Sequence, residues 1–210
     1  RAKQPDVPRW TSYLSNLSEN TEQPIKTFHS DDDPGTSEYQ FWLRTNCYQQ
    51  RQDGYSVITI ALPLGDLTSQ QMRQLAQIAR TYIGDSVRLT VEQNVVLRWV
   101  NKADLPSIYQ ALVQAGLAQP GAGTIADITA CPGTDTCKLG IASSRGLSAE
   151  LQSRFTQRGD SLPKSIEQLR IKTSGCFNSC GQHHIADLGF YGVSRKINGY
   201  AVPHFQVVLG

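Results

Sequence analysis

The stretches Cys131-Pro-Gly-Thr-Asp-Thr-Cys137 and Cys176-Phe-Asn-Ser-Cys180 carry four of the five cysteines in the chain. Glycine or proline lies within or beside each stretch, so each predicts a loop. The count of cysteines is odd and the N-terminal residues carry no apolar signal segment, which argues against a disulfide framework. Two tight thiol pairs instead predict a metal or cluster site in a reducing, cytoplasmic location.

Four thiolates are the ligand set of a [4Fe–4S] cluster, one for each iron. Structural zinc sites more often use C-x2-C to C-x4-C turns than the C-x5-C and C-x3-C pairs found here. On chemistry alone, a zinc site and a set of buried, unligated thiols stay open as alternatives. Gly133, Gly175 and Gly181 let backbone N–H groups turn toward the sulfurs. A helix beginning after Cys180 would add its positive N-terminal end. Cys47 has no close partner in sequence and is expected to be a buried or half-buried free thiol.

The residues before the cysteine loops predict the order β-α-β-β-α, which is a half-unit of the ferredoxin-like type in an α+β protein. Helical periodicity, capping residues and β-rich runs define these elements. They are a strand at 55–62, a helix from a Thr68–Gln71 capping box to Gly84, strands at 87–91 and 95–100 joined at Gln93-Asn94, and a helix from Asp104 to Gly116.

A Pro- and Gly-containing break at 119–123 predicts a domain boundary. Beyond it we expect a helix at 147–155, a strand at 169–173, and strands at 188–193 and 202–209 joined around the hairpin dipeptide Asn198-Gly199. We therefore divide the chain into an irregular N-terminal segment (1–45), a half-domain (46–118) and a cysteine-bearing domain (124–210). No helix follows to cover the last hairpin, so we expect a fragment of a longer protein, truncated at its C-terminus.

The charge balance and the distribution of apolar residues argue against two classes of partner. The chain has 20 Lys and Arg against 18 Asp and Glu, a formal net charge of +2. Proteins that bind nucleic acid usually show a strong basic excess, so no nucleic-acid partner is expected. No apolar run is long enough to span a bilayer, so no membrane association is expected.

The segments Thr129–Cys137 and Ser174–Gln182 resemble the signature of sirohaem-containing nitrite and sulfite reductases. The preceding β-α-β-β-α unit is similar to the ferredoxin-like half-domain that these proteins carry twice. The resemblance covers residues 40–210 and implies the C-terminal half of the usual protein: a half-domain followed by an α/β domain that binds the [4Fe–4S] cluster and the sirohaem. It implies six-electron reduction of nitrite to ammonia or of sulfite to sulfide.

The resemblance also implies roles for single residues. Four cysteines would ligate the cluster, and the last of them would also bridge to the sirohaem iron as its proximal ligand. Basic side chains near the loops are candidates for the sirohaem carboxylates, with ordinary solvated charge as the alternative, and one asparagine either binds near the cofactors or stabilises its own turn. The ligands are Cys131, Cys137, Cys176 and Cys180 (bridging); the further candidates are Asn178, Lys138 and Arg145, with Arg170 and Lys172 also near the loops.

Three features depart from the family pattern or lie beside the ligands. Phe177 stands where the family usually has proline, and Glu92 stands where the first repeat would carry an arginine. His183 and His184 are expected to lie behind the ligands or at the surface rather than to bind metal. The Arg and Lys side chains that grip the substrate belong mainly to the N-terminal half, so no catalytic residue is assigned and the chain alone is expected to be inactive.

The resemblance leaves substrate and partner open. Gly181-Gln182 resembles nitrite reductases more than sulfite reductases. No G-x-G-x-x-G motif is present, so a ferredoxin or a separate flavoprotein would deliver the electrons. Two alternatives remain: an enzyme like precorrin-3B synthase, with a cluster but no sirohaem, and a zinc-stabilised binding module.

Overall fold

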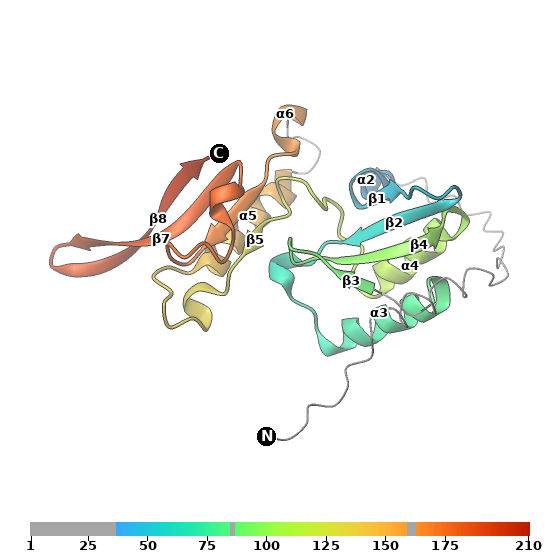
Figure 1. Cartoon of the computed structure of the whole chain (residues 1–210), viewed down its shortest axis with the longest axis horizontal. Helices are drawn as coiled ribbons and strands as arrows, with labels where there is room; N and C mark the ends of the chain where they lie inside the picture. Colours follow the sequence, from blue (N-terminus) through green and yellow to red (C-terminus); the bar gives the residue numbers. More distant parts are fainter. Residues whose placement is uncertain (1–36, 85–86, 159–162) are drawn as a thin grey trace, which may run out of the picture. The chain divides into compact units, whose positions relative to one another are not determined.

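The computed structural model of the chain describes residues 37–84, 87–158 and 163–210, which all belong to one compact unit. Helices and two four-stranded sheets make up the described residues (Figure 1), so the α+β prediction is confirmed. The first sheet and its helices comprise α2 (Ser37–Asn46), β1 (Cys47–Gln49), β2 (Tyr55–Ile60), η2 (Pro63–Gly65), α3 (Ser69–Tyr82), β3 (Val87–Leu89), β4 (Val95–Asn101), η3 (Lys102–Asp104) and α4 (Leu105–Gln114).

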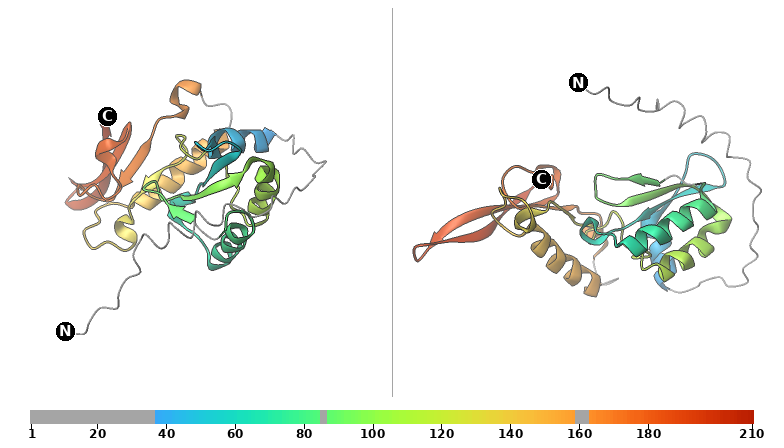
Figure 2. Two further views of the ribbon diagram at one scale, coloured as in Figure 1. Left: turned by 45° about the vertical axis from the view of Figure 1, so that its right-hand side comes forward. Right: turned by 90° about the horizontal axis from the view of Figure 1, so that it is seen from below.

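The first sheet is antiparallel, with the strand order β1-β2-β4-β3. Helices α3 and α4 lie together on one of its faces (Figure 2). Side chains on the covered face form the core, because alternate strand residues point toward the helices. Ile58 and Leu97 from the strands, and Ile108 and Leu112 from α4, are fully buried there.

Helix α3 begins where its sequence predicts. The Thr68 hydroxyl accepts a hydrogen bond from Gln71 N at 3.1 Å, and Gln71 Oε1 accepts one from Thr68 N at 3.0 Å. This reciprocal pair satisfies two backbone donors that the first turn of a helix leaves without partners. The helix ends at Tyr82, two residues before Gly84.

The prediction of an irregular segment at 1–45 is wrong over its last residues, where α2 forms; residues 1–36 lie outside the described part of the chain. Tyr39 and Trp42 are three residues apart, so they share one helix face. Both are buried, and their rings lie 4.9 Å and 5.0 Å from the Tyr109 ring. Packing against this aromatic ring stabilises a helix that its own sequence signals only weakly.

The predicted cap of α4 is also different. Asp104 occupies the N-cap position but its side chain makes no capping hydrogen bond. Strand β4 leads directly into the short helix η3, and Asn101 Oδ1 accepts from Ala103 N at 3.0 Å. The capping function therefore moves three residues upstream.

The second sheet has the order β5-β6-β7-β8, in which β5, β6 and β7 run parallel and β8 is antiparallel to β7. Asn198 and Gly199 form the predicted hairpin turn with positive φ angles, and both strands extend farther toward it than predicted. The second sheet and the helices around it comprise β5 (Thr129–Ala130), η4 (Gly133–Asp135), α5 (Ser144–Arg158), α6 (Lys164–Glu167), β6 (Ile171–Ser174), η6 (His183–Ile185), β7 (Leu188–Ile197) and β8 (Tyr200–Leu209).

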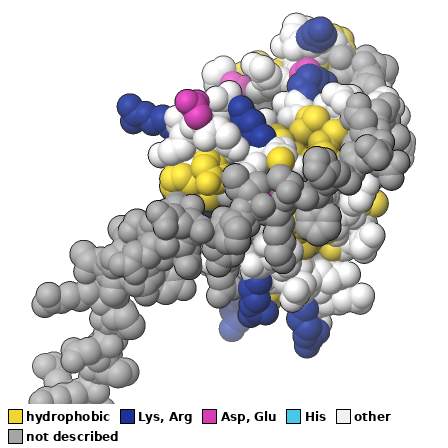
Figure 3. All heavy atoms as spheres, turned by 90° about the vertical axis from the view of Figure 1, so that its right-hand side faces the viewer, with side chains coloured by type: hydrophobic (Ala, Val, Ile, Leu, Met, Phe, Trp, Pro, Cys, Tyr) yellow, Lys and Arg dark blue, Asp and Glu magenta, His cyan; other side chains and the backbone are white. Residues whose placement is uncertain are grey.

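The surface carries no concentration of basic charge on the face drawn in Figure 3, where the Lys and Arg side chains of the described residues are scattered. None of the helices in the described ranges has both the length and the apolar composition that crossing a bilayer requires.

Replacing Thr68 by Ala removes the capping box of α3. We expect the free energy of unfolding to fall by about 1 kcal/mol, because a helix N–H loses its acceptor. Chemical denaturation monitored by circular dichroism measures this change. The matched control is Thr81→Ala in the same helix, whose hydroxyl only bonds the Gln77 carbonyl at 2.9 Å on the exposed face; equal losses in both variants would contradict the capping role.

Candidate metal centre

Parallel pairing of β5 with β6 brings the two cysteine turns together. Thr129 pairs with Lys172 and Ala130 with Thr173, and the carboxyl ends of parallel strands meet at the same sheet edge. Cys131 directly follows β5, and Cys176 comes two residues after β6. Two turns that are far apart in sequence are thereby neighbours in space.

Backbone contacts at Gly175 join the turns closely. Its N–H donates to Cys131 Sγ at 3.1 Å, and its carbonyl accepts from Ile141 N at 2.8 Å and Ala142 N at 3.0 Å. A Cβ atom on Gly175 would lie 2.6 Å from the Cα of Gly133, which is closer than side chains approach. Only glycine therefore allows this approach, and the N–H already points at a prospective ligand sulfur.

The four thiols differ in exposure. Cys131 and Cys176 are buried, whereas Cys137 and Cys180 are exposed. Two large apolar side chains beside them, Leu139 and Phe177, are 67% and 68% exposed. Among the residues that the structure describes, no three His, Cys, Asp or Glu side chains converge closely enough to hold one metal ion.

The helix predicted after Cys180 is absent. The three-residue 3-10 helix η6 follows a left-handed residue, Gln182 (φ 62°), and is too short for an appreciable dipole. Hydrogen bonding holds this segment instead, because Ser174 Oγ accepts from Gly181 N at 3.1 Å and lies 2.8 Å from His183 Nδ1.

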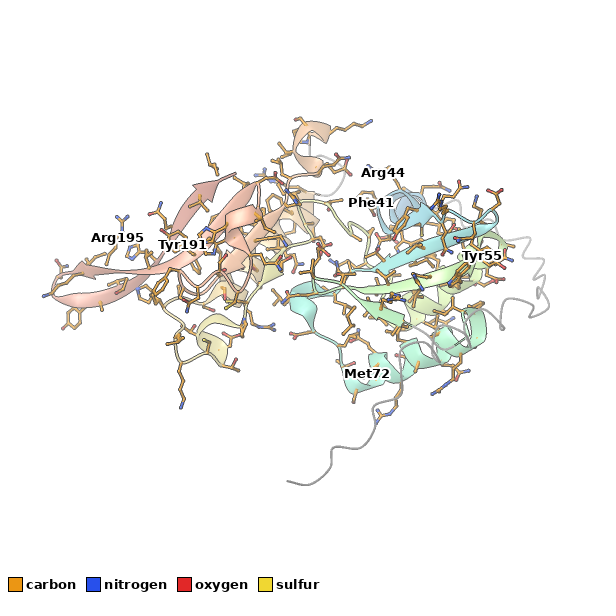
Figure 4. All side chains as sticks on the ribbon, in the orientation of Figure 1. Phe41, Arg44, Tyr55, Met72, Tyr191 and Arg195 are labelled. Atoms are coloured by element: carbon orange, nitrogen blue, oxygen red, sulfur yellow. The ribbon has the colours of Figure 1, made fainter. Side chains whose placement is uncertain are left out.

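Of the two histidines, His183 is buried and His184 is exposed. The His183 ring stacks on Tyr191 of β7 with centroids 4.9 Å apart, and Tyr191 is labelled in Figure 4. Its Nε2 is buried without a hydrogen-bond partner among the described residues. Burial and the neighbouring His184 lower the pKa of His183, so the ring is neutral near physiological pH. His183 is therefore buried beside the turn that carries Cys180 and is not at the surface, which was the other position expected for it.

Lys172 is not the solvated charge considered as an alternative. It is only 4% exposed, and its Nζ donates to Gln182 Oε1 at 3.0 Å and to Thr129 Oγ1 at 3.4 Å. Burial lowers the pKa of Lys172, while the carboxylates of Glu92 and Asp127 raise it. The sequence of β6 carries a signal for this burial. A central parallel strand is usually an apolar run, but β6 reads Ile-Lys-Thr-Ser, so its polar side chains need partners inside the fold.

The other basic candidates lie in different surroundings. Arg145 pairs with Asp66 and, at 3.1 Å, with Asp135, and it donates to the Leu64 carbonyl at 2.9 Å. Arg170 Nε lies 3.2 Å from Asp187 Oδ2. Both arginines therefore have carboxylate partners within the chain.

Lys138 and Asn178 are exposed, each within two residues of an exposed cysteine. Neither side chain is buried within the fold.

The turn between β3 and β4 of the first sheet, at Gln93 and Asn94, hydrogen bonds to residues just before Cys131. Gln93 Nε2 donates to the Ala130 carbonyl at 2.8 Å, and its Oε1 accepts from Ala130 N at 3.2 Å. Asn94 Nδ2 donates to Asp127 Oδ2 at 2.8 Å. Burial raises the pKa of Asp127, and hydrogen bonds from Gly123 N and Asn94 oppose this rise. The dipeptide predicted only as a turn thus binds β5 immediately before Cys131.

The donor chemistry fits an iron–sulfur cluster. Four thiols on two adjacent turns match its ligand number, and a backbone N–H already donates to one of the sulfurs. The exposed pair leaves one side of the turns accessible to a further group.

Comparison with known proteins gives two family matches. Residues 48–115 match the nitrite/sulfite reductase ferredoxin-like half domain, and residues 121–208 match the nitrite and sulphite reductase 4Fe-4S domain. Both matches agree with the half-domain and fold class expected from sequence.

Individual relatives are longer proteins. Ferredoxin–nitrite reductase of Synechococcus elongatus is 30% identical over 163 residues, covering 78% of this chain and 31% of that protein. The sulfite reductase [ferredoxin] of Mycobacterium tuberculosis is 26% identical, covering 77% and 30%. The solved structure of M. tuberculosis NirA superposes with a TM-score of 0.68 at 25% identity, covering 79% and 30%. The chain thus spans less than a third of each.

Replacing Gly175 by Ala tests the close approach of the turns. The added methyl group collides with Gly133, so we expect iron incorporation on anaerobic reconstitution to fall at least severalfold, while the far-ultraviolet circular dichroism of the chain stays close to that of the wild type. Iron analysis and circular dichroism measure both. The control is Gly146→Ala, whose Cβ would meet no backbone atom and only the Ser143 side chain, with the Oγ at 2.7 Å and the Cβ at 3.4 Å. Full incorporation in the Gly175 variant would show that the approach is not required.

The five thiols should differ in reactivity in the metal-free chain. Burial raises the pKa of Cys47 to about 12, so its thiol stays protonated and unreactive near pH 8. We expect iodoacetamide to label the exposed Cys137 and Cys180 first, with Cys47 reacting only on unfolding. Peptide mass spectrometry over time gives the order. Early labelling of Cys47 would contradict the raised pKa of this half-buried thiol.

Proposed function

Because the chain belongs to the nitrite and sulfite reductase family, we propose that it is the part of a larger oxidoreductase that holds a [4Fe–4S] cluster and a sirohaem. The complete enzyme carries out the six-electron reduction of nitrite to ammonia or of sulfite to sulfide. One observation carries the proposal: within the matched 4Fe-4S domain, the parallel β5–β6 pair joins two thiol turns through a hydrogen bond from Gly175 N–H to Cys131 Sγ.

In this proposal Cys131, Cys137, Cys176 and Cys180 ligate the four irons, and Cys180 is shared with the sirohaem iron. The bound pair of cofactors would supply single electrons in quick succession to a partly reduced substrate. The chain's own part is to fix the thiols: β5 and β6 set their separation, and the Gly175 N–H stabilises the Cys131 thiolate. The exposure of Cys180 supports its shared role, because a second iron must reach its sulfur.

The surroundings of the exposed thiols support a macrocycle there. Leu139, Phe177 and Ile185 lie within five residues of an exposed cysteine, and their exposed apolar side chains are available to pack against a bound macrocycle. Lys138 and Asn178 are available for the carboxylates or ring edge of the sirohaem. Arg145 already has two carboxylate partners, so we place it after Lys138 as a cofactor-binding candidate.

Substrate, donor and boundaries follow from the same assignment. Gly181-Gln182 favours nitrite, and several relatives are named as ferredoxin-dependent nitrite reductases, so we propose nitrite and a ferredoxin before sulfite and a flavoprotein. Residues 46–118 act as the half-domain and 124–210 as the cofactor domain of a cytoplasmic enzyme. The remaining part of the enzyme supplies the substrate-binding Arg and Lys side chains.

Anaerobic reconstitution of the chain with iron and sulfide tests the cluster. We expect four irons and four sulfides per chain and a broad brown absorption, with both lost in Cys131→Ser and kept in the control Cys47→Ser. Iron, sulfide and zinc analyses measure this. One zinc per chain without sulfide would replace the proposal by the zinc-stabilised module.

The enzyme that contains the chain tests the haem role. We expect a haem-type visible spectrum whose magnetic coupling to the cluster disappears in Cys180→Ser. An unchanged coupled spectrum would overturn the shared ligand, and a cluster without haem would favour the precorrin-3B synthase alternative. Turnover of nitrite or sulfite at enzyme-like rates by the isolated chain would contradict its role as one part of the enzyme.

A further inference from the structure

Strand β6 is the central structural element between the two thiol turns, and its buried residues are mostly polar. All four residues of Ile171–Ser174 are buried. Lys172 and Ser174 are two apart and so lie on the same face of the strand. Both side chains reach residues 181–183, the segment immediately after Cys180.

Lys172 contacts both turns at once. Its Nζ donates to Gln182 Oε1, two residues after Cys180, and to Thr129 Oγ1, two residues before Cys131. Both acceptors are neutral oxygens. Within the described ranges no carboxylate forms an ion pair with this ammonium, although Glu92 and Asp127 are near enough to raise its pKa.

A buried cation without an ion-pair partner is costly, because water has been removed and no opposite charge at contact distance replaces it. The chain nevertheless places a lysine at this buried position of the strand. An anion that the lysine faces only when the site is loaded accounts for this cost. A cluster with four thiolate ligands is such an anion, and it would lie at the edge where both contacted segments meet.

We propose that Lys172 is a positioning residue that supplies the buried counter-charge of the cluster and holds the flanks of Cys131 and Cys180 in register. The proposal rests on the proposed function, because it requires a cluster at the four cysteines. Among the described residues, Lys172 makes no hydrogen bond to a cysteine sulfur. It positions the cysteines through its hydrogen bonds to Thr129 and Gln182.

The charge has two opposite consequences. A nearby cation stabilises the reduced cluster, which is the more negative form, so Lys172 raises the reduction potential. In the metal-free chain, the proposal requires that the cost of burying the cation equals or exceeds the gain from its two hydrogen bonds. A lysine that merely supported the fold would stabilise the metal-free chain instead.

Four variants separate these possibilities: Lys172→Met, Lys172→Gln, Lys172→Arg and the exposed control Lys196→Met. For the metal-free chain, thermal unfolding should show a midpoint for Lys172→Met that equals or exceeds that of the wild type.

For the reconstituted chain, a redox titration followed by electron paramagnetic resonance gives the cluster potential. We expect Lys172→Met and Lys172→Gln to shift the reduction equilibrium about tenfold toward the oxidised form, which is 59 mV for one electron. The arginine and control variants should stay near the wild-type potential.

The outcomes are distinct. Failure of the wild-type chain to take up iron and sulfide overturns the proposed function itself. Normal iron uptake with an unchanged potential in Lys172→Met, or a lowered midpoint in its metal-free form, overturns the role of Lys172 alone. If both neutral variants lose the cluster, retention in Lys172→Arg supports the counter-charge and loss in Lys172→Arg overturns it.

Discussion

The parallel contact between β5 and β6 is the constraint on which the candidate site depends. It comprises only two residue pairs, yet it determines that Cys131 and Cys176 leave the sheet at one edge and in one direction. Parallel strands require a long crossover, and here α5 and α6 lie between them. The site therefore depends on contacts that are non-local in sequence, and side chains on both faces of β6 reinforce them.

The two faces of β6 hold different partners. On one face Thr173 Oγ1 lies 2.6 Å from Ser148 Oγ of α5, and Ser144 Oγ of the same helix donates to the Cys131 carbonyl at 2.8 Å. On the opposite face Lys172 and Ser174 hold the segment after Cys180. Buried polar groups of this kind are tolerated only when hydrogen bonded, and they favour one arrangement over its alternatives. Contacts from β6 therefore add to those of Gly175 in holding the segments beside the thiols.

Sequence reasoning was most successful where the signal is local. The Thr68 capping box and the Asn198-Gly199 hairpin each involve a few adjacent residues, so local geometry determines the outcome. Helix α2 was missed because its stability comes from packing on Tyr109, a distant residue. The helix expected after Cys180 does not form, because Gln182 adopts a left-handed conformation there and only the three-residue helix η6 follows.

Lys172 illustrates the same limit at the site. Its type suggested a solvated charge, and only the tertiary structure shows it buried between Thr129 and Gln182. The four cysteines, in contrast, are candidate metal ligands on sequence alone, because the spacing within each pair can be read from adjacent residues.

The amide of Gln93 has a consequence for how the molecule folds. By bonding both backbone groups of Ala130, this side chain acts as a surrogate strand along the free edge of β5. The Ala130 peptide group is therefore protected only when the two sheet regions have met. Cooperative folding of the two regions follows, and slow amide exchange at Ala130 would report their assembly rather than the stability of either sheet alone.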